Sequence, residues 1–125
     1  MVWILLFLGG GLGTLARFVL ATVVQVRADS DFPFGTLVVN LSGCLVMGLL
    51  AAIFAARPTG LPAVERAVLT GFLGGYTTFS AFGLESMRLF EAGEPGLAFS
   101  YVAASVVLGP GATALGLVAG RLVAA

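Results

Sequence analysis

The amino-acid sequence predicts an all-α integral membrane protein with four transmembrane helices, in a single domain of residues 1–125. Hydrophobic residues make up 59% of the 125 residues and charged residues only 10%, and the mean hydropathy is +1.10. A soluble domain carries about 25% charged residues, so this chain has too few polar side chains to cover a water-facing surface. The charges separate four long, almost uncharged runs, and about 20 apolar residues let a helix cross a bilayer.

The first two predicted spans cover residues 2–26 and 34–56. The first contains one charge, Arg17, which we expect to snorkel to the interface or, as a second reading, to lie in a vestibule. It has neither a positively charged start nor an obvious cleavage site, so we expect a retained span rather than a signal peptide. The second contains Asn40, whose amide must find a partner on another helix or in a pore.

The third predicted span covers residues 65–90, after a helix-breaking cluster at 57–62, and we expect it to be broken at 74–78. Its middle reads GFLGGYTTFSAF at 71–82, and paired glycines followed by two threonines form helix poorly. Irregular backbone survives in a bilayer only when it is buried in protein or lines a cavity. We therefore expect a break near the bilayer midplane that presents backbone carbonyls and amides as ligands. The alternative is that Gly71 and Gly75 form only a helix-packing face.

The fourth predicted span covers residues 97–121. Tyr101 and Ser105 are four residues apart, so their hydroxyls share one face of this helix. Gly109 is next on that face and has no hydroxyl, and Pro110 follows it. The polar stripe is therefore expected to stop at a kink.

Two phenylalanines and a glutamate follow the expected break on one helix face. Phe79 and Phe82 are three residues apart, and Glu85 is one turn further on. Such a phenylalanine pair usually packs in a core. Aromatic rings also have a positive edge, however, so an edge-on phenylalanine can attract an anion.

Several functional classes find no support in the sequence. It contains no histidine, its acidic residues lie in turns or at helix ends, and its one cysteine, Cys44, lies in an apolar run typical of a buried small hydrophobe. An enzyme is therefore not expected, and a net charge of zero does not favour nucleic acid. A small four-helix multidrug-type transporter remains an alternative, although its mechanism needs an acidic residue that the first span lacks. A structural membrane subunit is a third possibility, and the polar groups at the break count against it.

Four stretches together resemble the Fluc fluoride channel family, also called CrcB. They are GGGLGTLARF at 9–18, PFGTLVVNLSG at 33–43, the run at 71–82 and the pair Tyr101 and Ser105. They follow the family's order and spacing, and the TTFSAF run is the most specific. The resemblance implies passive export of fluoride across the cell membrane, which limits its toxicity. It also implies a dimer of two oppositely oriented chains with two ion pathways, although a non-identical second chain remains an alternative to a homodimer.

The resemblance also implies roles for individual residues. A structural sodium ion (Na⁺) at the dimer centre would be held by the backbone carbonyls of Gly74 and Thr77. Arg17 and Glu85 are expected in the vestibule. The residues implied to line the ion pathway are Asn40, Thr78, Phe79, Ser80, Phe82, Tyr101 and Ser105. At Gly109 the chain departs from relatives that often continue the hydroxyl track.

The residue types suit fluoride, because a small ion that holds its water tightly needs replacement hydrogen bonds as it dehydrates. Hydroxyls, an amide and ring edges supply them without a fixed cation that would trap the ion. The arginines divide evenly between the two expected membrane sides, so the positive-inside rule favours neither orientation. One side has Arg57, Arg66 and Arg121, and the other has Arg17, Arg27 and Arg88.

Overall fold

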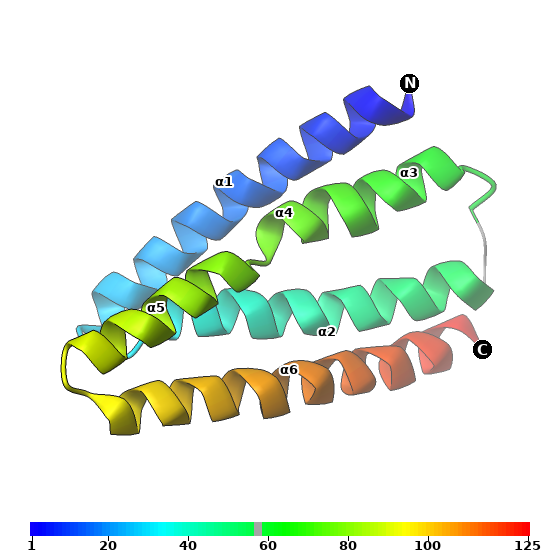
Figure 1. The fold of residues 1–125 in the computed structure, drawn as a ribbon. Helices are drawn as coiled ribbons and strands as arrows, with labels where there is room; N and C mark the ends of the chain where they lie inside the picture. The colour runs from blue at the N-terminus through cyan, green and yellow to red at the C-terminus, as the bar shows by residue number, and fades with distance from the viewer. Residues whose placement is uncertain (57–58) are drawn as a thin grey trace.

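The structure, a computed structural model, describes residues 1–56 and 59–125 (Figure 1). Every regular element in these residues is helical, and four helical segments among them are long and apolar enough to cross a membrane. The predicted all-helical fold with four spans is thereby confirmed. Arg57 and Pro58, which belong to the predicted breaker cluster, lie outside the described residues. The four segments are Val2–Ala28, Phe34–Ala56, Pro62–Glu91 and Pro95–Ala124.

The helices start and end at residues whose backbone preferences favour a terminus. Helix α1 (Val2–Ala28) ends where Asp29 adopts the left-handed conformation, with φ 44°, which aspartate tolerates better than most residues. Prolines open α3 (Pro62–Arg66) and α6 (Pro95–Ala124), because a fixed φ and a missing N–H suit the first helical turn. Gly93, with φ 79°, makes the turn that leads into α6.

Helix α2 (Phe34–Ala56) packs closely against the C-terminal half of α6 (Figure 1). A Cβ atom at Gly116 would lie 2.1 Å from the carbonyl oxygen of Leu45, and one at Gly48 would lie 2.3 Å from that of Thr113. Only glycine therefore permits this approach of the two backbones. Close packing of small residues is a principal attraction between helices in lipid, so this pair anchors the bundle.

The third segment begins as one helical run beside α1. It consists of α3, the π-helical stretch η1 (Ala67–Leu73) and α4 (Gly74–Tyr76). The sequence did not predict the π-helical stretch. A Cβ atom at Gly13 of α1 would lie 2.0 Å from the carbonyl oxygen of Phe72. The backbone of this run is thus in direct contact with α1.

Two extended residues separate α4 from α5 (Phe79–Glu91). Thr77 has φ −84° and ψ 159°, and Thr78 has φ −150° and ψ 121°. The sequence predicts irregular backbone over 74–78, and for 74–76 this prediction is wrong because these residues are helical. The reason is tertiary: Gly75 packs against α1, where its Cβ atom would lie 2.4 Å from the carbonyl oxygen of Gly10.

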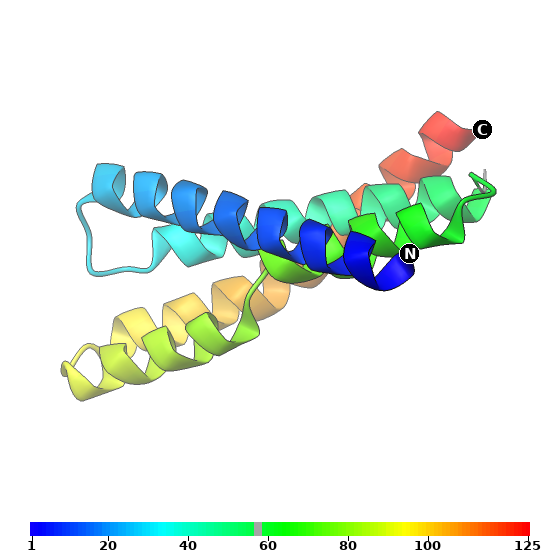
Figure 2. The same ribbon diagram turned by 90° about the horizontal axis from the view of Figure 1, so that it is seen from above.

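The chain changes direction at the two extended residues. Figure 2 shows that α5 and the N-terminal half of α6 diverge from α1 and from the start of α2. A small buried core joins α5 to α2 and α6 at this end, formed by Leu37, Leu89, Ala98 and Tyr101. The divergence leaves room for a cavity beside α1, and it brings side chains of α2, α5 and α6 together.

Candidate functional site

The side chain of Asn40 holds the second extended residue from both sides. Its Nδ2 donates to the carbonyl oxygen of Thr78 at 2.9 Å, and its Oδ1 accepts from the amide of Thr78 at 2.8 Å. The sequence left two partners open for this amide, another helix or a pore. The structure shows it bound to the backbone of the third segment, at Thr78. An amide NH₂ group has two hydrogens, so Asn40 keeps a second donor beyond this pair.

Glu85 joins three helices through its two carboxylate oxygens. The hydroxyl of Thr36 donates to Oε1 at 2.7 Å, and the hydroxyl of Tyr101 donates to Oε2 at 2.7 Å. Tyr101 is fully buried, with 0% of its surface exposed. Its hydroxyl is thus committed to a carboxylate, and an anion that used this donor would have to displace Glu85.

The two phenylalanines differ in their surroundings. Phe82 packs on Tyr101, with ring centroids 5.4 Å apart, and joins the margin of the buried core. Phe79 lies 5.4 Å from Phe82, centroid to centroid, but 82% of its surface is exposed. Phe82 therefore has a packing role in this chain, whereas Phe79 contributes little to the chain's own core.

Three hydroxyls of the predicted pathway have contrasting partners. The Oγ1 of Thr78 accepts from the amide of Ala81 at 3.2 Å, which caps the start of α5, and lies 3.3 Å from the Oγ of Ser80. The Oγ of Ser105 is buried and has no hydrogen-bond partner in residues 1–56 and 59–125. A buried hydroxyl without a partner costs about 1–3 kcal/mol, so Ser105 needs an explanation outside the chain's own packing.

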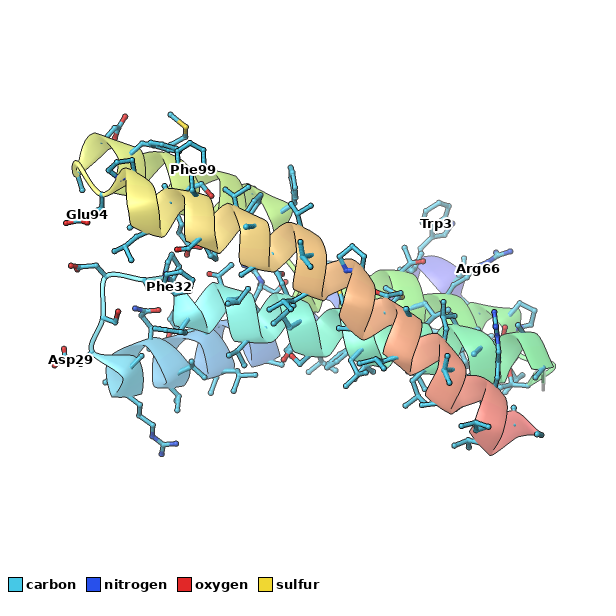
Figure 3. The ribbon with its side chains drawn as sticks, turned by 90° about the horizontal axis from the view of Figure 1, so that it is seen from below. Trp3, Asp29, Phe32, Arg66, Glu94 and Phe99 are labelled. Carbon is cyan, nitrogen blue, oxygen red and sulfur yellow. The ribbon has the colours of Figure 1, made fainter. Side chains whose placement is uncertain are left out.

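A cavity of about 710 Å³ opens between the C-terminal half of α1, the start of α2 and α5. Glu85 and Thr36 line it, together with Arg88. Figure 3 shows Asp29, Phe32 and Glu94 at the same end of the molecule, and Trp3 and Arg66 at the opposite end. Glu85 thus lines a recess of mixed polar and apolar side chains, and its vestibule role stays a prediction.

Arg17 lies elsewhere. Its Nε donates to the carbonyl oxygen of Gly75 at 3.2 Å, and the hydroxyl of Thr14 approaches the same oxygen at 3.4 Å. The expected snorkelling towards the end of α1 is therefore wrong, because helical side chains point towards the N-terminus and this one meets the third segment there. Arg17 is also absent from the lining of the 710 Å³ cavity, so the structure does not bring it together with Glu85.

The backbone around Gly74 and Thr77 supplies oxygen atoms but no charged ligands. In a continuous helix the amide of Thr78 would donate to the carbonyl of Gly74, but it donates to Asn40 instead. Gly74 is exposed on the surface of the chain. The described residues contain no group of three or more histidine, cysteine, aspartate or glutamate side chains that could hold a metal. Neutral carbonyl oxygens suit a hard monovalent cation better than a transition metal.

Several residues of the site were missed by the sequence analysis. Thr36 binds Glu85, and Ser42 binds Tyr76 with 2.8 Å between their hydroxyl oxygens. Thr36 could have been found, because it is four residues before Asn40 and shares its helix face. The Ser42–Tyr76 contact joins α2 to α4, and no periodicity within either segment predicts it.

Comparison with known proteins adds an independent line of information. Residues 4–117 match the model of a family described as CrcB-like protein, Camphor Resistance (CrcB). The fluoride-specific ion channel FluC of Paracoccus denitrificans is 50% identical over 114 residues, which cover 91% of this chain and 90% of that protein. The FluC proteins of Stutzerimonas stutzeri and Rhodopseudomonas palustris are each 47% identical, over 91% and 86% of this chain and 92% and 87% of their own lengths. The chain therefore belongs to the CrcB family.

Proposed function

We propose that this multi-pass membrane protein conducts fluoride passively across the cell membrane and thereby limits the toxicity of the ion. Relatives that are 40–50% identical over most of the chain are named fluoride-specific ion channels. Within the structure, the observation that carries the proposal is the buried hydroxyl of Ser105, which has no partner in the described residues. A buried donor without a partner is a favourable contact for a dehydrated anion.

The proposed pathway uses donors that carry no full positive charge. The rings of Phe79 and Phe82 present their positive edges, Ser105 presents a hydroxyl, and Asn40 retains one amide hydrogen beyond its pair with Thr78. Together they replace the water that fluoride loses, and none binds it so strongly that it cannot leave. Thr78 and Ser80 add hydroxyls next to Phe79.

Tyr101 and Glu85 would act together at the cavity end of this pathway. The hydroxyl of Tyr101 donates to Glu85 in the resting arrangement. Fluoride that reaches Tyr101 must therefore compete with the carboxylate for one hydrogen. Displacement of Glu85 towards the 710 Å³ cavity, which it already lines, would release the tyrosine donor to the ion.

The proposal includes a dimer of two identical chains in opposite orientations. Phe79, Ser80 and Gly74 are exposed beside the extended residues. A polar and aromatic surface next to interrupted backbone is unfavourable in lipid. A second copy is the simplest cover for this surface, and the break would then lie near the bilayer midplane. A non-identical second chain is the alternative partner.

A structural Na⁺ is proposed at the centre of this dimer, held by the carbonyl oxygens of Gly74 and Thr77 from each chain. The fit of Na⁺ to this site rests on the oxygen atoms that the backbone offers. The carbonyl of Gly74 lacks its usual helical donor because the Thr78 amide pairs with Asn40, and neutral oxygens match a hard cation. When bound, the cation would supply charge that holds the two interrupted segments together.

Fluoride efflux from liposomes that contain only this purified chain is the direct test. We expect fluoride to leave down its gradient when a potassium ionophore balances charge, and chloride to be retained under the same conditions. Efflux that required a proton gradient would favour the multidrug-type transporter. A purified chain that folds and is inactive would point to a structural subunit or to the need for a second, different chain.

A further inference from the structure

We propose that Asn40, and Ser42 acting through Tyr76, are positioning residues that fix the direction of the Thr77 carbonyl for the structural cation. This inference rests on the proposed function, because it concerns the Na⁺ site named there. It assigns Asn40 a second role besides lining the pathway, and it gives Ser42 and Tyr76 a role for the first time.

Asn40 orients the peptide bond between Thr77 and Thr78. A trans peptide unit is planar, and its C=O and N–H groups point in opposite directions. The N–H of Thr78 donates to the Oδ1 of Asn40 at 2.8 Å. Since this N–H points at Asn40, the carbonyl of Thr77 must point away from α2. Nδ2 of Asn40 also donates to the Thr78 carbonyl at 2.9 Å, which holds the next peptide unit in place.

A hydroxyl pair joins α2 to α4 two residues further along α2, at Ser42 and Tyr76. The hydroxyl of Ser42 donates to the carbonyl oxygen of Val39 at 3.0 Å, so its only hydrogen is used. Tyr76, whose oxygen lies 2.8 Å from the Oγ of Ser42, must therefore be the donor of this pair. The ring of Tyr76 is also stacked on Phe72, at 6.1 Å between centroids. The residue just before Thr77 is thus held by α2.

Gly43 lies on α2 against Thr77 and Tyr76, which the contacts of Asn40 and Ser42 flank. A Cβ atom at Gly43 would lie 2.3 Å from the Cγ2 of Thr77 and 3.2 Å from the ring of Tyr76. The methyl group of Thr77 therefore packs directly on the backbone of α2. Its hydroxyl donates to the carbonyl of Leu73 at 3.0 Å. The side chain of Thr77 is fully engaged, which leaves its carbonyl as the group that faces away.

These contacts give the α2 segment 40–43 one function. Asn40 holds Thr78, Gly43 packs on Thr77, and Ser42 holds Tyr76. These contacts with α2 would order the extended backbone before any cation binds. A preorganised oxygen binds more tightly, because its ordering does not have to be supplied at the moment of binding. Asn40 further links the cation site to the ion pathway, since the same amide belongs to both.

The sharpest test is the Na⁺ dependence of thermal stability in the purified dimer. A ligand that binds only the folded state raises Tm, and the rise grows with the logarithm of the ratio of ligand concentration to Kd. We expect wild-type dimer to be more stable in NaCl than in the chloride of a large organic cation. Tyr76→Phe and Ser42→Ala should each raise the Kd for Na⁺, fitted from the dependence of Tm on Na⁺ concentration, about fivefold, the effect expected from one hydrogen bond. The double variant should be no worse than either, because both remove the same hydrogen bond.

Asn40→Ala should have the larger effect, with a rise in the Kd for Na⁺ of about tenfold or more, because two hydrogen bonds are lost. Ser100→Ala is the matched control: its hydroxyl makes a similar bond to the carbonyl three residues earlier, at 2.9 Å from Leu97, on the exposed face of α6. It should leave the Na⁺ dependence unchanged. Tyr76→Phe keeps the ring and its packing, so it decides the question if Asn40→Ala does not fold.

The outcomes separate this inference from the proposed function. A wild-type Na⁺ dependence in Tyr76→Phe and Ser42→Ala would overturn the positioning role. Fluoride efflux without any Na⁺-dependent stabilisation in wild type would overturn it as well, because no cation would be there to position. If wild type shows the Na⁺ effect and the variants shift it while efflux is absent, the positioning role stands and the channel proposal fails.

Discussion

At the scale of single residues, the polar atoms of this site fall into two groups. Asn40, Tyr101 and Thr78 are engaged with partners in their own chain. Ser105 has a buried hydroxyl without a partner among the described residues, and Phe79 is an exposed ring. The first group builds the structure, and under the proposed function it would contribute to transport only through spare or displaceable hydrogens. No structural role is evident for Ser105 or Phe79, so substitutions of these two residues test transport most directly.

Ser105→Ala should separate stability from transport. Removal of a buried hydroxyl that makes no hydrogen bond should leave Tm unchanged or raise stability by about 1 kcal/mol. If that hydroxyl serves the ion, fluoride efflux should fall several-fold. Thermal unfolding and efflux measured on the same preparation check both. A less stable variant with wild-type efflux would make Ser105 a packing residue.

Phe79→Leu and Phe82→Leu should differ in how much they lower stability, but they should reduce fluoride efflux to a similar extent. Phe79 is 82% exposed, so its replacement should cost the single chain little, whereas Phe82 packs on Tyr101 and should cost about 1 kcal/mol. If ring edges stabilise the ion by about 1.4 kcal/mol, each change should reduce efflux about tenfold. Efflux per dimer, with assembly checked by size-exclusion chromatography, measures the effect. Full efflux in both variants would return the pair to an ordinary packing role.

At the scale of elements, the third segment explains what a sequence can and cannot predict. The four spans follow from uncharged runs, which are a local property. The π-helical stretch and the helical state of Gly74 and Gly75 depend on contact with α1, which local propensity does not contain. Arg17 was misplaced for the same reason, since its acceptor is a backbone carbonyl 58 residues away. The sequence motifs identified residues of the site, but the contacts of those residues depend on tertiary structure.

The contact between α1 and the third segment can be tested with one pair of glycines. Gly13→Ala would place a methyl group 2.0 Å from the carbonyl oxygen of Phe72, whereas Gly11→Ala meets no atom within 4 Å. Since backbone cannot move aside cheaply, we expect the first change to destabilise the protein by about 1–3 kcal/mol. The second should leave stability almost unchanged. Equal Tm values for the two variants would mean that this helix contact is looser than described.

At the scale of the whole molecule, the arginine count changes once Arg17 is placed. Its contact with Gly75 removes it from the loops and helix ends. Arg27 and Arg88 then remain on one side, against Arg66, Arg121 and, by the sequence prediction alone, Arg57 on the other. A difference of one arginine is a weak bias under the positive-inside rule. It is compatible with insertion in both orientations, although the balance is less even than the sequence alone suggests.

Single-cysteine labelling measures this orientation. After replacement of Cys44 by serine or alanine, a cysteine in the loop near Ser30 should react with a membrane-impermeant reagent from both sides of the membrane. The two populations should approach equality, as a homodimer of oppositely oriented chains requires. Labelling from one side only would exclude that homodimer and favour a second, different chain. A cysteine at Thr59, in the opposite loop, provides the reciprocal measurement.

The interruption at Thr77 and Thr78 also changes the electrostatics of the third segment. An unbroken helix has one macrodipole, with partial charges only at its two far ends. Here the helical run that ends at Tyr76 places a partial negative charge at the interruption, and α5, which begins at Phe79, places a partial positive charge beside it. Each amounts to roughly half an elementary charge. Two residues of extended backbone therefore create, within one segment, neighbouring regions of opposite potential that a continuous helix would confine to its two far ends. The guanidinium of Arg17, which donates to the carbonyl of Gly75, lies at the negative one.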